Sequence, residues 1–135
     1  MTGLAGKLSR IMLVLWAGSL WALALWVAPL VFRLAPDRHA AGLIAAGLFQ
    51  AETYLTFALA FIALWRYGRQ RCGAIYVAAA LLAINEFIIK KIFEYIRVNG
   101  NVAGLSFGGW HGISAAIYVS ACLAALLVVW QDDFR

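Results

Sequence analysis

Charged residues are scarce in this sequence. They make up 13% of the 135 residues, about half of the roughly 25% that is usual in soluble domains. Hydrophobic residues make up 65%, more apolar surface than a soluble domain of this length could cover. The composition therefore indicates lipid as the solvent. The Lys and Arg residues lie between apolar runs rather than in one stripe, which argues against nucleic acid as a partner.

Residues and motifs that hold cofactors or metals are also few. Methionine occurs only at positions 1 and 12, and histidine only at positions 39 and 111. Cys72 and Cys122 have no metal-ligand spacing and are interpreted as core thiols rather than a disulfide. P-loop, dinucleotide-binding, Ser-centred elbow and HExxH motifs are all missing. We therefore predict no cofactor, no metal site and no catalytic residue.

Four long apolar runs fill most of the chain. A hydrocarbon core about 30 Å thick needs roughly 20 helical residues, and each run is long enough. The sequence therefore predicts an all-α membrane protein, a four-transmembrane-helix bundle forming a single membrane domain over residues 1–135. The predicted helices span residues 11–33, 41–65, 72–96 and 107–130. The first run continues to Phe32, so an uncleaved anchor helix is favoured over a signal peptide.

Basic residues suggest how the helices are oriented. Four spans place both termini on one side, which would also carry Lys7, Arg10, Arg66, Arg69, Arg71 and Arg135. The opposite side would carry Arg33, Arg38 and Arg97, with Lys90 and Lys91 at the end of the third helix. By the positive-inside rule, the Arg66–Arg71 cluster predicts that both termini are cytoplasmic.

Small residues four positions apart suggest where helices approach one another closely. Such pairs allow backbones to pack in lipid, within one bundle or between two copies of the chain. Packing within the bundle is the favoured interpretation. The candidate packing residues are Gly18, Ala22, Gly42, Ala46, Gly108, Gly112 and Ala116. Pro29 is expected to kink the first helix or to mark its final turn.

Polar residues inside apolar helices are the candidates for function, because burying them in hydrocarbon is costly. Glu52 lies near the middle of the second helix. Glu86 and Lys90 form an i,i+4 pair of opposite charge on the third helix, next to Asn85. For Lys90, the favoured interpretation is a lysine that reaches the membrane surface as the helix leaves the bilayer.

The fourth helix carries His111, with Ser114 and Tyr118 at i+3 and i+7. At 1.5 Å per residue, His111 and Glu86 lie roughly 6–9 Å below the same membrane face. The sequence leaves open whether they are in contact.

Several sequence blocks resemble one family. They are residues 15–18 and 27–32 in the first helix, 41–49 in the second, and Trp110-His111-Gly112-Ile113-Ser114 with Tyr118 in the fourth. In this order and spacing, the chain resembles, over residues 15–127, the bacterial four-helix family named domain of unknown function 4149, related to eukaryotic transmembrane protein 205. The resemblance implies a multi-pass protein of the bacterial inner (cytoplasmic) membrane and supplies no activity. The third helix departs from the family pattern, with Asn85-Glu86 and Lys90-Lys91 where a proline-containing exit is expected.

Three functions stay open on these grounds. The first, favoured, is a non-enzymatic small transporter or permeation subunit that acts as an oligomer. The second is an accessory or assembly subunit that docks another membrane protein through its polar face. The third is a membrane redox or haem-handling protein. The expected partners are the lipid bilayer and either further copies of the chain or another membrane protein.

Overall fold

The computed structural model describes residues 3–67 and 73–133, and helices account for most of them. Four continuous helical segments are long and apolar enough to cross a membrane: Leu4–Leu34, Arg38–Trp65, Gly73–Asn99 and Phe107–Gln131. The predicted four-span, all-helical fold is therefore confirmed. In order, the elements are α1 (Leu4–Ala22), the π-helix η1 (Leu23–Val27), α2 (Ala28–Leu34), α3 (Arg38–Tyr67), α4 (Gly73–Ala83), the π-helix η3 (Ile84–Ile89), α5 (Lys90–Asn99) and α6 (Phe107–Asp133).

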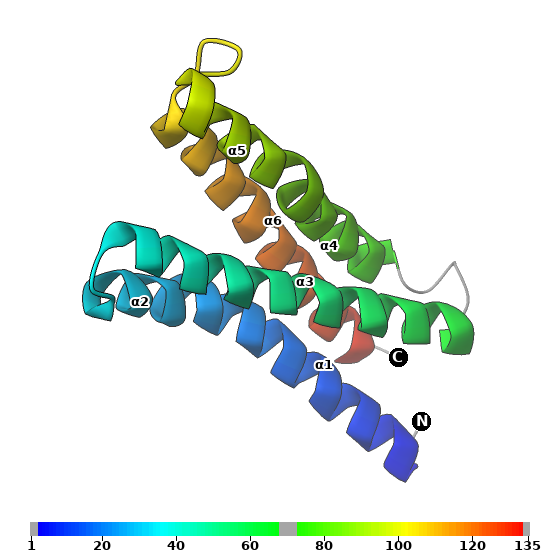
Figure 1. The fold of residues 1–135 in the computed structure, drawn as a ribbon. Coiled ribbons are helices and arrows are strands. Elements are labelled where there is room, and N and C mark those ends of the chain that lie inside the picture. The colour runs from blue at the N-terminus through cyan, green and yellow to red at the C-terminus, as the bar shows by residue number, and fades with distance from the viewer. Residues whose placement is uncertain (1–2, 68–72, 134–135) are drawn as a thin grey trace.

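The spans form two helical hairpins (Figure 1). The first hairpin pairs α1–η1–α2 with α3, and the second pairs α4–η3–α5 with α6. Contacts between the hairpins are made chiefly by α1 with α6 and by α3 with α4. The hairpins separate toward the ends that carry the connections 35–37 and 100–106, which we call the open end (Figure 1). Both chain ends point to the opposite, closed end.

Local chemistry fixes the two connections at the open end. The Asp37 carboxylate caps α3 by accepting a hydrogen bond from the Ala40 N–H at 2.7 Å. Gly100 ends α5 with a φ of 88°, and its N–H donates to the Ile96 carbonyl. A tight turn with positive φ at Ala103 and Gly104 then lets the two residues flanking it pair through their backbones.

Two spans contain a π-helical turn. In the first, Pro29 has no N–H to donate to the carbonyl four residues earlier, and the wider turn of η1 lies directly before it. Pro29 therefore does not mark the final turn, because the span continues to Leu34; the prediction of a kink stays a prediction. The turn of η3 contains no proline, and here the Lys90 N–H donates to the Asn85 carbonyl. The π-turn η3 contains the polar residues Asn85 and Glu86 of the third span.

Alanine forms the closest helix contacts. Ala78 on α4 and Ala121 and Ala125 on α6 are completely buried, so the two backbones approach with little side chain between them. Cys122 is also fully buried, as a free thiol. Cys72 lies outside the described residues, as do Arg69, Arg71, Arg135 and the side chain of Arg66.

The small residues predicted to pack within the bundle lie elsewhere. Six of them are exposed: Gly18, Ala22, Ala46, Gly108, Gly112 and Ala116. The seventh, Gly42, is half-buried. A side chain added at Gly18, Gly42 or Gly112 would meet no atom within 4 Å. The preference for packing inside the bundle is therefore wrong for the six exposed positions. The four-residue spacing was present, but the helices present other faces to one another.

Large apolar side chains cover the outside of the molecule. Trp65 is 83% exposed and Trp26 79%, and many leucines and isoleucines lie on the same surface. This inverted surface is what four membrane-spanning helices require, because hydrocarbon rather than water contacts it.

Candidate functional site

A hydrogen-bond chain joins α1 to α3 in the middle of the membrane-spanning region. The Trp16 indole N–H donates to the Thr56 hydroxyl at 2.8 Å, and that hydroxyl donates to the Glu52 carbonyl, also at 2.8 Å. The Ser19 hydroxyl lies 3.1 Å from a Glu52 carboxyl oxygen and 2.7 Å from the Trp16 carbonyl. These contacts fasten the predicted candidate Glu52 to the first span.

Trp16 and Ser19 were not among the predicted site residues. Ser19 is the only hydroxyl residue in the apolar run 11–32, and Trp16 lies three residues before it, on the same face of a helix. An isolated hydroxyl in a transmembrane helix is a usable signal, because it needs a partner there. The partner itself could not be identified without the packing of α1 on α3.

The Glu52 carboxyl also lines a groove between the first two spans. The groove has a volume of about 310 Å³, and Ser19, Leu23, Val27 and Leu48 are among its other lining residues. A second groove of about 360 Å³ begins at Val27 and continues to the connection 35–37. Together they form an apolar furrow from the open end to Glu52.

Asn85 joins the third span to the fourth. Its side-chain N–H donates to the Ser114 carbonyl on α6 at 3.0 Å, while its side-chain oxygen is buried without a partner among the described residues. Asn85 lies inside the π-turn η3, and such turns are frequent at functional sites. The structure therefore brings together two of the predicted candidates, Asn85 and Ser114, through the Ser114 backbone.

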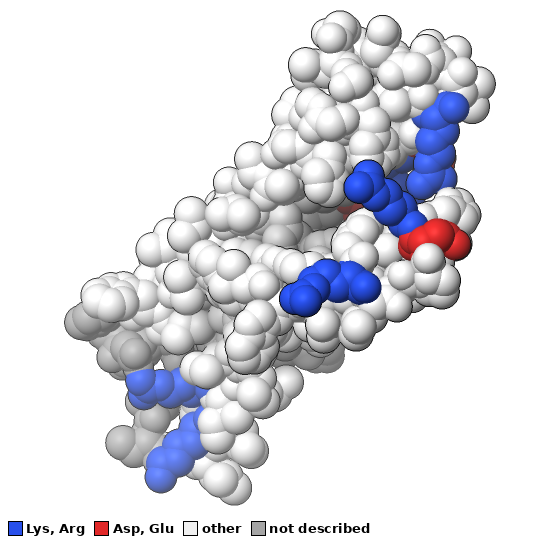
Figure 2. Space-filling model, turned by 90° about the vertical axis from the view of Figure 1, so that its left-hand side faces the viewer, with Lys and Arg blue, Asp and Glu red and all other residues white. Residues whose placement is uncertain are grey.

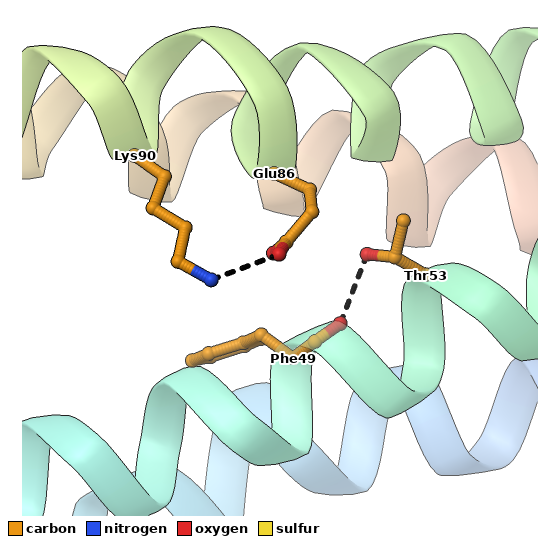
Figure 3. Close-up of polar contacts among 4 residues, drawn as sticks. All are labelled: Phe49, Thr53, Glu86 and Lys90. Carbon is orange, nitrogen blue, oxygen red and sulfur yellow. Dashed lines mark hydrogen bonds and ion pairs between the residues drawn. The ribbon is translucent and has the colours of Figure 1, made fainter.

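Glu86 and Lys90 form an ion pair with 3.0 Å between nitrogen and oxygen. Both side chains reach from the third span toward α3, where Phe49 and Thr53 lie opposite (Figure 3). The Glu86 side chain is only 10% exposed, whereas that of Lys90 is 42% exposed. The pair therefore faces the other hairpin rather than lipid.

Basic side chains surround the same end of the molecule. Viewed from the side of the open end, Lys and Arg side chains lie beside a hollow between the hairpins, and an acidic side chain lies against one of them (Figure 2). The hollow lies where the hairpins separate. Charged side chains can therefore lie beside it and stay away from the apolar outer surface.

The remaining two candidates lie apart from this pair. His111 is exposed and stacks on Phe107 with ring centroids 6.1 Å apart. In the described part of the chain it forms no hydrogen bond or ion pair with Glu86. Tyr118 is buried, donates its hydroxyl hydrogen to the Leu20 carbonyl at 2.9 Å, and packs edge-on against Phe49. These contacts give Tyr118 a structural role between hairpins.

Four apolar spans, with a few polar groups turned inward, define an integral membrane protein of the four-helix class. Within that class the chain belongs to the family described as domain of unknown function (DUF4149), whose model matches residues 11–102. The match ends before α6, so the block around His111 lies outside it. No curated protein and no solved structure matches the chain. The relation to eukaryotic transmembrane protein 205 stays a prediction.

Proposed function

We propose that this protein is a small transporter or permeation subunit of the bacterial inner membrane, with both termini in the cytoplasm. The observation that carries the proposal is the Glu86–Lys90 ion pair, held on the inner side of a hairpin where the two hairpins separate. A charge pair inside a membrane span is costly unless it borders water or protein. Water reaching the pair from the open end would make this hollow a vestibule for a polar solute or an ion.

The small size of the chain supports action as an oligomer. Beyond the vestibule, the closed half is filled by alanine contacts and by the Trp16–Thr56 and Tyr118–Leu20 hydrogen bonds. A pathway through one protomer would have to break these contacts. A pathway completed between protomers would leave them intact, and the exposed small residues offer smooth surfaces for such packing.

Flux measurements on the full-length protein in liposomes test the transport proposal. Glu86→Gln removes the counter-charge of Lys90, and Glu52→Gln removes the carboxyl that lies deeper in the membrane. Glu94→Gln is the matched control, because Glu94 is an exposed residue of the same span. We expect proton or solute flux to fall with Glu86→Gln and to persist with Glu94→Gln. Unchanged flux with both Glu86→Gln and Glu52→Gln would overturn the proposal.

Cysteine accessibility tests the orientation. In a chain with Cys72→Ser and Cys122→Ala, a cysteine placed at Asn101 should react with a membrane-impermeant maleimide on intact cells. A cysteine placed at Lys7 should react only after the membrane is permeabilised. The reverse pattern would place both termini outside.

A further inference from the structure

Glu52 differs from Glu86 in having no cationic partner. Among the described residues, no Lys, Arg or His forms an ion pair with the Glu52 carboxyl, whereas Glu86 has Lys90. Within the same residues, its carboxyl makes one hydrogen bond, with the Ser19 hydroxyl. The titratable groups that α6 presents near it, Tyr118 and Cys122, are neutral in their protonated forms and provide no positive charge. α1 contributes no titratable group within the run 11–32.

The geometry around Ser19 indicates which form of the carboxyl is present. The Ser19 hydroxyl has one hydrogen but two oxygens within reach, the Trp16 carbonyl at 2.7 Å and the Glu52 carboxyl at 3.1 Å. The shorter contact takes the hydrogen. The Ser19 hydroxyl is also the donor of the longer contact, so the Glu52 carboxyl receives only a minor share of one hydrogen, too little to replace the water that a carboxylate would lose. An unpaired carboxylate in hydrocarbon would also be strongly unfavourable.

The furrow makes this acid accessible from the lipid phase. Apart from Glu52 and Ser19, the residues lining the inner groove are apolar, among them Leu23, Val27 and Leu55. The groove lies between the first span and α3, and exposed residues of both, Ala22 and Leu55 among them, line it, so it opens on the outside of the first hairpin. A molecule dissolved in the hydrocarbon can therefore reach the carboxyl without passing through water or through the hollow beside Glu86.

We propose that Glu52 is a neutral carboxylic acid that faces the hydrocarbon and donates its O–H as a hydrogen bond to lipophilic acceptors that enter the groove. The site is separate from the Glu86–Lys90 ion pair, which reaches toward α3 from the third span, opposite Phe49 and Thr53. Its existence does not depend on whether the protein transports a solute.

Carbodiimides distinguish such an acid from a water-exposed carboxylate. The Glu52 O–H adds across one C=N bond of the reagent: the proton goes to nitrogen, and the carboxyl oxygen bonds to the central carbon. In a dry site without a nucleophile, the acyl group then moves to the neighbouring nitrogen to give a stable N-acylurea. All atoms of both molecules stay in the product. The lipophilic reagent dicyclohexylcarbodiimide enters hydrocarbon, whereas a cationic water-soluble carbodiimide does not.

The experiment treats the full-length protein in phospholipid nanodiscs with each reagent and maps adducts by peptide mass spectrometry. We expect dicyclohexylcarbodiimide to modify Glu52, Glu52→Gln to lose that adduct, and Glu86→Gln to keep it. With an added amine such as glycine ethyl ester, the water-soluble reagent should convert the exposed Glu94 to the amide, releasing the reagent as its urea, and should leave Glu52 unmodified.

Two outcomes would overturn the proposal. One is the absence of a dicyclohexylcarbodiimide adduct at Glu52, and the other is equal modification of Glu52 by both reagents. The wild-type peptide map decides either outcome even if Glu52→Gln does not fold. Because adduct formation is read without transport, loss of flux in Glu86→Gln and modification of Glu52 succeed or fail independently.

Discussion

The closed and open halves of the molecule differ in how their helices pack and in which polar groups they carry. In the closed half, Ala78, Ala121 and Ala125 bring α4 and α6 together, and indole and phenol groups hydrogen-bond across helices. In the open half the hairpins separate. The polar groups there are the Glu86–Lys90 ion pair and Asn85, which lies in a π-turn. Polar groups that bind neighbouring helices hold the bundle together, whereas charged groups lie where the bundle parts.

The largest expected effect comes from enlarging an alanine in the closed half. Ala121→Leu inserts three carbon atoms where the side chain is fully buried, and overpacking of this kind costs about 1–3 kcal/mol. Thermal or denaturant unfolding of the purified protein in detergent measures the loss. Ala116→Leu is the matched control, because Ala116 is exposed on the same helix. Equal destabilisation by both changes would contradict the division into packed and lipid-facing faces.

A smaller effect is expected from the hydrogen bond between α1 and α3. Trp16→Phe and Thr56→Val each remove one partner of the 2.8 Å contact. A double-mutant cycle isolates their coupling, which we expect at about 0.6–1.7 kcal/mol, the range found for hydrogen bonds between transmembrane helices. Trp26→Phe, at a site 79% exposed, should leave the unfolding free energy nearly unchanged. A coupling near zero would remove this bond from the account of the closed half.

In the open half, stability and function should separate. Glu86→Gln removes the charge that faces Lys90, but Lys90 is 42% exposed, so the loss in unfolding free energy should be only about 0.5–1 kcal/mol. Flux should respond far more than stability if the vestibule proposal holds. A large loss of stability with unchanged flux would instead mark the pair as structural.

The smallest effect is expected at His111. The side chain is exposed and its only recorded contact in the described residues is the stack on Phe107, so His111→Ala should change unfolding free energy by less than about 0.5 kcal/mol. The same unfolding assay measures it. A loss above that of Glu86→Gln would reveal a contact made only in an oligomer, which native mass spectrometry of the two variants would then test.

Much of the fold followed from the sequence, but less of the site did. The charge scarcity and the four apolar runs were enough to predict four spans, and the i,i+4 spacing was enough to predict that Glu86 pairs with Lys90. Helix spacing gave the wrong packing face on α6, since Gly108 and Gly112 satisfy the same pattern as the buried Ala121 and Ala125. Contacts between helices, such as that of Ser19 with Glu52, could not be predicted from the spacing of residues within one helix.

The sequence by itself determined the class of protein and the number of its spans, because hydrocarbon accepts only segments that satisfy their own backbone hydrogen bonds. It also determined which residues would be costly to bury. Only the tertiary structure decided what each of them faces. The rotation of each helix about its axis and the crossing of the two hairpins depend on contacts between residues far apart in the chain. These contacts turn Glu86 toward the other hairpin, Glu52 toward the groove between the first two spans, and His111 away from both.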